Sequence, residues 1–339
     1  MSKPIKLIIL GAISGFICMV LLVWLCSRSS AEKESYALIR LNNGQLIPNI
    51  GLGTWAMDDD QAREAVKEAV SVGYRHIDTA WRYGNEVGVG QALKELFESK
   101  QLTRDDIFIT SKIWNTFHSR QLAVKGIEES LKNLGLDYLD LALIHWPTGF
   151  KAGTDDIYPR RDDGSIMPSD NDIVDTWRGM EDLYRNGLAK SIGVSNFNIR
   201  QLERIIRQAS IKPSVNQFER HPFLIQQELV NYCQNHSIAV IAYSPLRQAD
   251  PQLLENPVLK DIAQTHNKTV AQVALRWQIE SGVIVIAKSS RKERLIENMD
   301  IFDYQLSDQE MKRISTLDQN KRLIDIPGIQ SHSEYPFDN

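Results

Sequence analysis

The chain has 339 residues, of which 42% are apolar and 24% are charged, and its formal net charge is −4. An α/β barrel of this length can be a single domain. The slightly acidic balance argues against nucleic acid as a partner, because phosphate binding needs clustered basic charge. Three cysteines, two of them in the apolar N-terminal run, provide neither a disulfide framework nor a zinc site.

An uncharged apolar run occupies Leu7–Cys26, with Lys3 and Lys6 before it and Arg28 after it. A helix of about 20 residues spans the hydrocarbon core of a bilayer. We therefore predict a single N-terminal transmembrane helix that anchors the protein in a lipid bilayer. Residues 1–35 would be anchor and linker, and residues 36–339 would form the enzyme domain. A cleaved signal peptide is the alternative, because Ser29-Ser30-Ala31 resembles a cleavage site, although the apolar run is longer than usual.

A hairpin is predicted at Leu38–Ile50, where Asn43-Gly44 suits a tight turn. Eight candidate strands follow and alternate with segments that carry apolar residues at helical spacing. The strands are expected at Ile50–Gly53, His76–Ala80, Ile107–Ile113, Leu139–Trp146, Ser191–Ser195, Ser214–Phe218, Ala239–Tyr243 and Val283–Ala287. This alternation predicts a (β/α)8 TIM barrel, the fold class α/β. One extra helix is expected at Ser307–Leu317, and the tail from Asp318 has no periodicity.

Polar residues lie at the carboxyl ends of three successive strands. Asp78 is near the end of the second predicted strand, and Tyr83 follows it in a loop. Lys112 and His145 are near the ends of the third and fourth. In a TIM barrel, residues at these ends form the active site. Each residue alone has an ordinary explanation, such as a helix cap or a solvated lysine, so their joint placement carries the argument.

The chain from about Leu38 to Phe337 resembles the aldo-keto reductases. The interval from Asp78 to Tyr83 is five residues, that from Tyr83 to Lys112 is 29 and that from Lys112 to His145 is 33, as in that family's tetrad. Three further motifs agree with it: Gly51-Leu52-Gly53-Thr54-Trp55, Gly193-Val194-Ser195-Asn196-Phe197 and Ala242-Tyr243-Ser244-Pro245-Leu246. The chain is most similar to the aldose and aldehyde reductase branch, through His145-Trp146-Pro147-Thr148-Gly149-Phe150 and Glu334-Tyr335-Pro336-Phe337.

The resemblance implies reduction of a carbonyl group, with Tyr83 as the general acid. A phenol has an ordinary pKa near 10, so we expect Lys112 to lower the pKa of Tyr83. Asp78 would keep Lys112 charged and oriented, and His145 would orient the carbonyl oxygen. The tetrad therefore supports proton transfer, while the hydride must come from a cofactor because no side chain donates one.

No Rossmann fingerprint is present, since Gly88-Val89-Gly90 lacks the third glycine and follows no strand. The resemblance implies NADPH as cofactor, with Ser195, Asn196 and Gln217 on the nicotinamide carboxamide and Tyr243 stacked on the ring. Cationic and hydroxyl groups after the last strand would bind the 2′-phosphate, namely Lys288, Ser289 and Arg294. The other cofactor contacts implied are Thr54, Asp78, Ser244, Leu246, Glu297 and Asn298.

The substrate would be a small carbonyl compound bound beside the tetrad. The resemblance places it among Trp55, His145, Trp146, Ile324 and Ile326. The loop Leu246–Leu253 is shorter than in the relatives. We therefore expect an apolar pocket that is more open on one side.

Two functions of different classes remain open. The first is an NADPH-dependent carbonyl reductase, a monomer whose barrel faces the cytosol, since the lone soluble thiol Cys233 shows no adaptation to an oxidising compartment. The second is an NADPH-binding regulatory subunit of a membrane complex with little turnover. A metal-dependent hydrolase is disfavoured, because His76, His118, His145 and His221 form no ligand-spaced cluster with carboxylates.

Overall fold

The computed structural model describes residues 36–154 and 156–337. Leu38–Asn339 forms one compact unit. The predicted membrane anchor at Leu7–Cys26 lies outside the described residues. Within the described ranges, no helix is long and apolar enough to cross a bilayer.

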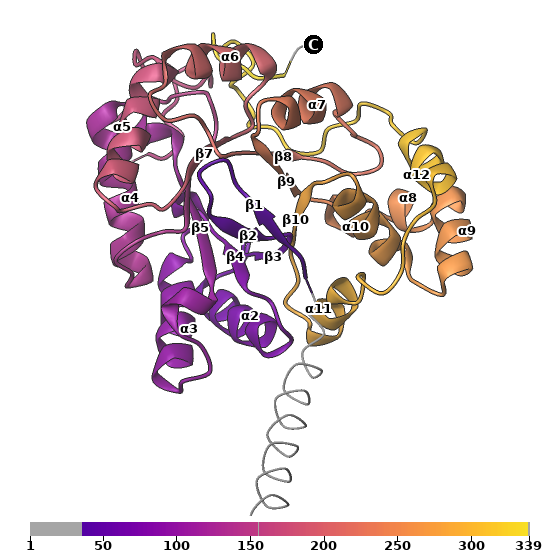
Figure 1. The fold of residues 1–339 in the computed structure, drawn as a ribbon. Helices are drawn as coiled ribbons and strands as arrows, with labels where there is room; N and C mark the ends of the chain where they lie inside the picture. The colour runs from indigo at the N-terminus through magenta and orange to yellow at the C-terminus, as the bar shows by residue number, and fades with distance from the viewer. Residues whose placement is uncertain (1–35, 155, 338–339) are drawn as a thin grey trace, which may run out of the picture. The chain divides into compact units, whose positions relative to one another are not determined.

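Eight parallel strands close into a barrel at the centre of the molecule (Figure 1). Pairing follows the chain order from β3 to β10, and β10 returns to β3 to complete the ring. The strands are β3 (Ile50–Gly53), β4 (His76–Asp78), β5 (Phe108–Ile113), β6 (Leu141–Ile144), β7 (Ile192–Ser195), β8 (Val215–Glu219), β9 (Ala239–Tyr243) and β10 (Ile284–Ala287). The predicted TIM barrel is confirmed, with strand ends within a few residues of those expected.

Helices surround this barrel (Figure 1). Those that follow the strands in turn are α2 (Asp59–Ser71), α3 (Glu86–Glu98), α4 (Arg120–Leu134), α5 (Ile173–Arg185), α6 (Ile199–Gln208), α7 (Gln227–Asn235), α10 (Val270–Glu280) and α11 (Lys292–Met299). The extra helix predicted near the C-terminus is α12 (Asp308–Ser315), which starts with a capping box between Ser307 and Glu310. Further additions that the sequence did not reveal are α8 (Pro251–Leu254) and α9 (Pro257–His266), along with the short 3₁₀ helices η1 (Trp81–Tyr83), η2 (Arg104–Asp106), η3 (Asn115–Phe117) and η4 (Arg247–Ala249).

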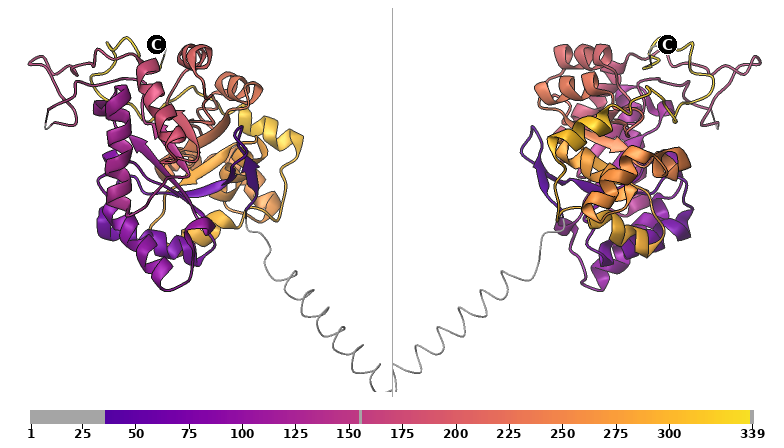
Figure 2. Two further views of the ribbon diagram at one scale, coloured as in Figure 1. Left: turned by 60° about the vertical axis from the view of Figure 1, so that its left-hand side comes forward. Right: turned by 90° about the vertical axis from the view of Figure 1, so that its right-hand side faces the viewer.

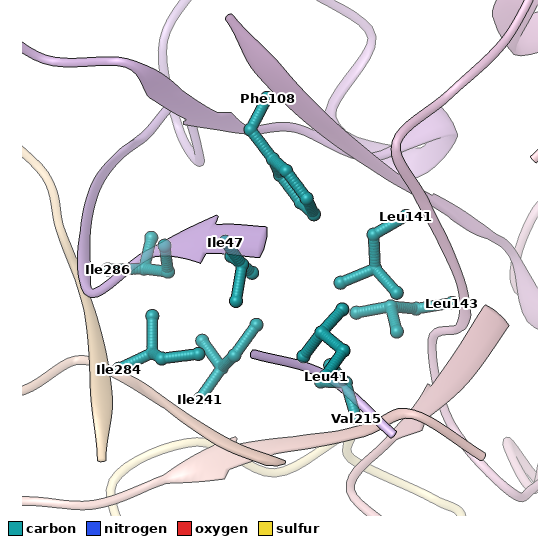
Figure 3. Packing of buried hydrophobic residues seen from close by; sticks show 9 residues of the cluster. All are labelled: Leu41, Ile47, Phe108, Leu141, Leu143, Val215, Ile241, Ile284 and Ile286. Atoms are coloured by element: carbon teal, nitrogen blue, oxygen red, sulfur yellow. The ribbon is translucent and has the colours of Figure 1, made fainter. Parts of the chain in front are cut away.

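The predicted hairpin closes the amino-terminal end of the barrel. It consists of β1 (Leu38–Arg40) and β2 (Leu46–Pro48), joined by a turn in which Gly44 has a φ of +90°. Leu41 and Ile47 from this hairpin pack against side chains near the amino-terminal ends of the strands (Figure 3). Because this end is filled by apolar side chains, a ligand can enter only from the carboxyl-terminal rim.

The glycines of Gly88-Val89-Gly90 serve helix packing. They lie on α3, where a Cβ at Gly88 would come within 2.0 Å of the carbonyl oxygen of Asp59, at the start of α2. A Cβ at Gly90 would come within 2.6 Å of the carbonyl oxygen of Leu134, at the end of α4. Both glycines thus allow close packing between helices, and they lie within a helix.

Candidate active site

Four polar side chains from neighbouring strand ends form the centre of the site. Asp78 is the last residue of β4, and Lys112 lies on β5. His145 follows β6 directly, and Tyr83 ends η1 in the loop after β4. Because β4, β5 and β6 are adjacent in a parallel sheet, their carboxyl ends meet at one rim. The structure thus brings the predicted tetrad together.

Asp78 and Lys112 form a buried ion pair beneath this rim. Lys112 Nζ lies 2.5 Å from Asp78 Oδ1 and donates a second hydrogen bond, of 2.9 Å, to the carbonyl oxygen of Thr79. Gln217 Nε2 donates to the other carboxylate oxygen of Asp78 at 2.8 Å. A buried charge is tolerated when it is paired and hydrogen-bonded, and both conditions hold here. The pair therefore holds Lys112 in one position beside Tyr83.

Tyr83 and Lys112 are in contact, with 3.4 Å between the phenolic oxygen and Nζ. Burial nevertheless raises the pKa of Tyr83 well above its usual value, and the negative charge of Asp78 adds to the rise while Arg82 opposes it. The predicted net lowering of the Tyr83 pKa by Lys112 is wrong in direction. The physical reason is that loss of water around the phenol outweighs the neighbouring cations. Tyr83 consequently keeps its proton at neutral pH.

His145 contacts the Tyr83 ring edge to face, with 5.6 Å between the ring centroids. Burial lowers the pKa of His145 well below its usual value, and the charges of Lys112 and Arg82 lower it further. The imidazole is therefore neutral at pH 7 and carries one N–H donor. Within residues 36–154 and 156–337, its Nδ1 has no hydrogen-bond partner. A neutral imidazole at this place can orient an oxygen atom without competing for the Tyr83 proton.

The residues predicted for the nicotinamide lie on the next strands around the rim. Asn196 follows β7 with a φ of +63°, a conformation that asparagine tolerates. Its amide donates to the carbonyl oxygen of His145 at 2.9 Å and to Ser195 Oγ at 3.2 Å, and it accepts from Tyr243 Oη at 2.7 Å. Each side chain thus fixes its neighbour. The group is a preorganised polar wall next to the tetrad.

The residues predicted for the phosphate lie after β10. Lys288 Nζ donates to the carbonyl oxygen of Ala56 at 3.0 Å, and burial lowers the pKa of Lys288. The buried Ser289 hydroxyl accepts from the Arg291 backbone N–H at 3.1 Å, in the turn that opens α11. Arg294 is exposed on that helix and makes no ion pair with any described residue. Cationic groups therefore gather here as predicted, with Arg291 as an addition that the sequence analysis overlooked.

One cavity of about 790 Å³ connects these groups. It is lined by the predicted residues Trp55, Tyr83, His145, Trp146, Asn196, Gln217, Tyr243, Ser244, Leu246, Lys288, Ser289, Arg294, Glu297, Asn298, Ile324 and Ile326. Four other predicted residues, Thr54, Asp78, Lys112 and Ser195, are buried and do not line it. Thr54, for example, donates its backbone N–H to the carbonyl oxygen of Asp78 at 3.0 Å. Among them, Lys112 contacts Tyr83 and Ser195 contacts Asn196, and both of these partners line the cavity.

The C-terminal tail forms one wall of the cavity, through Ile324, Asp325 and Ile326. The buried carboxylate of Glu219 at the end of β8 accepts backbone N–H groups from Leu323 and Ile324, each at 2.8 Å. Farther along, the Gly328 carbonyl oxygen accepts from the Ile166 backbone at 3.3 Å, so the tail runs beside the loop after β6 (Figure 2). A tail without periodicity is therefore fixed by specific hydrogen bonds.

The cavity is mostly apolar, as predicted, and it also contains side chains that were not predicted. Arg82 and Asp325 line it together with Trp114 and Tyr158, and the sequence analysis overlooked all four. Two of them could have been predicted from their positions in the sequence, because Arg82 directly precedes Tyr83 and Trp114 directly follows β5. Asp325 and Tyr158 come from long loops, which carry no periodic pattern. Across the described residues, no group of three or more His, Cys, Asp or Glu side chains could hold a metal ion.

Comparison with known proteins agrees with this geometry. The profile of the Aldo/keto reductase family matches residues 49–319. Aldo-keto reductase family 1 member A1 of Gallus gallus is 42% identical over 319 residues, which cover 89% of this chain and 97% of that protein. The corresponding protein A1-A of Danio rerio is 45% identical over 320 residues, covering 89% of this chain and 98% of that protein.

Two solved structures share the fold. An aldose reductase from Schistosoma japonicum matches with a TM-score of 0.85 and 44% identity, covering 89% of this chain and 98% of that one. A Bombyx mori aldo-keto reductase in complex with NADP matches with a TM-score of 0.82 and 39% identity, covering 89% of this chain and 99% of that one. This chain belongs to the aldo/keto reductase family of NADP(H)-dependent oxidoreductases, on its aldose and aldehyde reductase branch.

Proposed function

We propose that this protein reduces aldehydes and ketones to alcohols with NADPH and that Tyr83 is the general acid. The observation that carries the proposal is the cavity itself. It joins a protonated phenol, held beside a buried Lys112–Asp78 pair, to a cationic region at Lys288 and Arg294. A carbonyl reductase needs a proton donor at one end of its cavity and cationic groups that bind an anionic cofactor at the other end.

The residues present fit a nicotinamide dinucleotide phosphate. Asn196 and Gln217 offer amide groups that match a carboxamide, and Tyr243 offers an aromatic face beside them. Lys288, Ser289 and Arg294 offer cationic and hydroxyl groups to a phosphate. When bound, the reduced cofactor supplies the hydride to the carbonyl carbon.

Tyr83 supplies the proton to the carbonyl oxygen. As the carbon gains hydride, its oxygen becomes an alkoxide, a base comparable in strength to hydroxide. Proton transfer from a phenol to such a base is favourable even when the phenol pKa is raised. Lys112 stabilises the phenolate that results, because Nζ lies 3.4 Å from the oxygen. The raised pKa therefore keeps Tyr83 protonated before the reaction, and the adjacent Lys112 cation helps Tyr83 to release its proton.

His145 orients the substrate. Its neutral ring lines the cavity next to Tyr83, and a single N–H can donate to the same carbonyl oxygen. Two donors that converge on one oxygen fix the carbonyl plane and stabilise the developing negative charge.

Turnover of the full-length protein with NADPH and benzaldehyde tests this function directly. Consumption of NADPH with formation of benzyl alcohol is the expected result. Tight NADPH binding without any alcohol product would refute the reductase and support the regulatory alternative instead.

Cofactor choice gives a second test. Arg294→Gln should weaken NADPH binding by about tenfold or more, since a charge-assisted bond to phosphate contributes about 1.5–3 kcal/mol. Binding of NADH, which lacks the 2′-phosphate, should change far less. Lys292→Gln is a matched control, because this cation on the same helix pairs with Glu68 at 3.0 Å. Fluorescence titration with both cofactors measures the effect, and equal losses for NADPH and NADH would show that Arg294 has no phosphate role.

We also propose that residues 1–30 anchor the protein in a membrane and that the barrel faces the cytosol. The support is the uncharged run Leu7–Cys26, together with hairpin packing that begins only near Leu38. Deletion of residues 1–30 should release the protein into the soluble fraction without changing its activity. The intact protein should sediment with membranes in high salt, and protease added to sealed microsomes should digest the barrel. Asn235-His236-Ser237 and Asn267-Lys268-Thr269 match the N-glycosylation sequon, so a protected barrel with glycans at either site would reverse the orientation.

A further inference from the structure

Asn85 is the residue at which α3 begins, yet its side chain does not cap that helix. An asparagine at this position ordinarily accepts a hydrogen bond from a backbone N–H in the first turn. Within residues 36–154 and 156–337, the Asn85 side chain accepts none from α3. Asp59 Oδ1, on α2, instead accepts from the backbone N–H of Gly88 at 2.7 Å. The amide of Asn85 is therefore available for other contacts.

The Asn85 side chain is fully buried and joins three segments at the carboxyl-terminal rim of the barrel. Its Nδ2 donates to the carbonyl oxygen of Thr54 at 2.8 Å and to that of Met57 at 2.9 Å. Its Oδ1 accepts from Thr79 Oγ1 at 3.2 Å. Both donor hydrogens and the acceptor of the amide are thus engaged. Because Thr54 follows β3 and Thr79 follows β4, Asn85 ties its own loop to the ends of two neighbouring strands.

Tyr83 depends on its backbone for its position in the cavity. The phenolic oxygen lies 3.4 Å from Lys112 Nζ, which is longer than a usual hydrogen bond. The chain leaves Tyr83 through Gly84, whose φ is +67°, and reaches Asn85 two residues after the acid. Fixing Asn85 therefore fixes one end of the turn that carries the phenol.

The segment that Asn85 binds also contacts a residue proposed to hold the cofactor. Trp55 lies between the two residues whose carbonyl groups accept from Asn85, and it lines the cavity. The carbonyl oxygen of Ala56 accepts from Lys288 Nζ at 3.0 Å. One buried amide thus connects the turn that carries the acid with the segment that contacts Lys288.

We infer that Asn85 is a positioning residue for the reduction and that its amide fixes the separation between Tyr83 and the cofactor. This inference rests on the proposed function and adds a residue to it. Proton and hydride must reach the two atoms of one carbonyl group, so the acid and the cofactor have to be held at a fixed separation. A displacement of about 1 Å can cost about 10²-fold in rate. Loss of the amide donors should therefore slow the chemical step more than it weakens cofactor binding.

Asn85→Asp tests this role, because it keeps the shape of the side chain and replaces the donor NH₂ group with an oxygen. That oxygen would face the carbonyl groups of Thr54 and Met57. With benzaldehyde and saturating NADPH, kcat should fall by about 10²-fold. The dissociation constant of NADPH should change far less. The primary isotope effect with 4-deuterated NADPH should increase, because hydride transfer then limits the rate.

Asn43→Asp is the matched control. The Asn43 amide donates to the carbonyl oxygen of Lys190 at 2.9 Å, in the turn of the hairpin that closes the opposite end of the barrel. This change removes a comparable contact away from the cavity, so kcat should equal that of the wild type.

Thr79→Val is a second variant, which decides the question if Asn85→Asp fails to fold. It removes the hydroxyl that donates to Asn85 Oδ1 and keeps the shape of the side chain. We expect kcat to fall by about two- to tenfold, the equivalent of one neutral hydrogen bond. Folded variants at Asn85 and Thr79 that keep the kcat of Asn43→Asp would overturn the inference. Losses of NADPH affinity as large as the losses in kcat would overturn it as well.

Hydrogen exchange measured by mass spectrometry tests the same link without turnover. In Asn85→Asp, the backbone amides of residues 54–57 and 83–85 should exchange faster together, while those of the hairpin stay as in the wild type. Faster exchange in one segment alone, or in neither, would contradict the role of Asn85. Faster exchange in both segments of a protein that does not reduce benzaldehyde would uphold the link between them and refute only the proposed activity.

Discussion

Tyr83→Phe should abolish carbonyl reduction while NADPH binding stays close to that of the wild type. The substitution removes only the phenolic oxygen, which lies 3.4 Å from Lys112 Nζ and carries the proton that the product alcohol needs. Loss of general acid catalysis lowers rates by about 10²–10⁴-fold. The residues proposed to hold the cofactor lie on other strands, so a cofactor titration should change little. Single-turnover and steady-state rates with one aldehyde measure the effect.

Tyr232→Phe is the matched control. Tyr232 lies on α7 and stacks on His236, outside the cavity, so activity should be unchanged. If Tyr83→Phe retained more than about a tenth of wild-type turnover, a different group would have to supply the proton and the assignment of Tyr83 would fail.

Lys112→Met should cause the largest loss of stability among the site variants. Lys112 is fully buried, and among residues 36–154 and 156–337 its removal leaves the Asp78 carboxylate in the interior with Gln217 as its one side-chain partner. Breaking a buried ion pair from one side costs about 3–5 kcal/mol in the free energy of unfolding. Urea unfolding of the protein without residues 1–30 measures this cost, and turnover should fall as well because the phenolate loses its adjacent cation.

The double variant Asp78→Asn/Lys112→Met separates charge from packing. It leaves no uncompensated buried charge, so we expect it to unfold at higher urea concentration than Lys112→Met alone. Lys94→Met is the control for general loss of a lysine. Its side chain is 74% exposed and lies 3.9 Å from Glu98, so the change should stay within about 1 kcal/mol. A loss of similar size for Lys112→Met would mean that the buried pair contributes little to stability.

Much of the fold could be predicted because its signals are local. The eight strands are short apolar segments bounded by turn residues, and the intervening helices have apolar residues at helical spacing. The positions of Asp78, Lys112 and His145 could be predicted from the ends of the strands alone, because neighbouring parallel strands bring their carboxyl ends to one rim. The turn at Asn43-Gly44 could be predicted because glycine readily adopts the positive φ that Gly44 has there.

Features that depend on contacts between distant segments were missed or judged wrongly. The pKa of Tyr83 was predicted to fall, because the sequence shows a lysine at the right spacing but not the loss of water that burial causes. Asp325 and Tyr158 were not predicted to line the cavity, because their positions depend on how two loops pack on the rim. The tail is fixed by Glu219, a contact across about a hundred residues of sequence that no periodic pattern marks.

The sequence by itself determined the barrel, the tetrad and the family, because each rests on local periodicity or on spacing along the chain. Only the tertiary structure decided how those groups behave. Burial sets the protonation of Tyr83 and His145. The hydrogen bond from Arg82 to Tyr158 joins two loops that are 76 residues apart in the sequence. Desolvation and the pairing of charges depend on all the atoms around a group, and these atoms come from segments that only folding brings together.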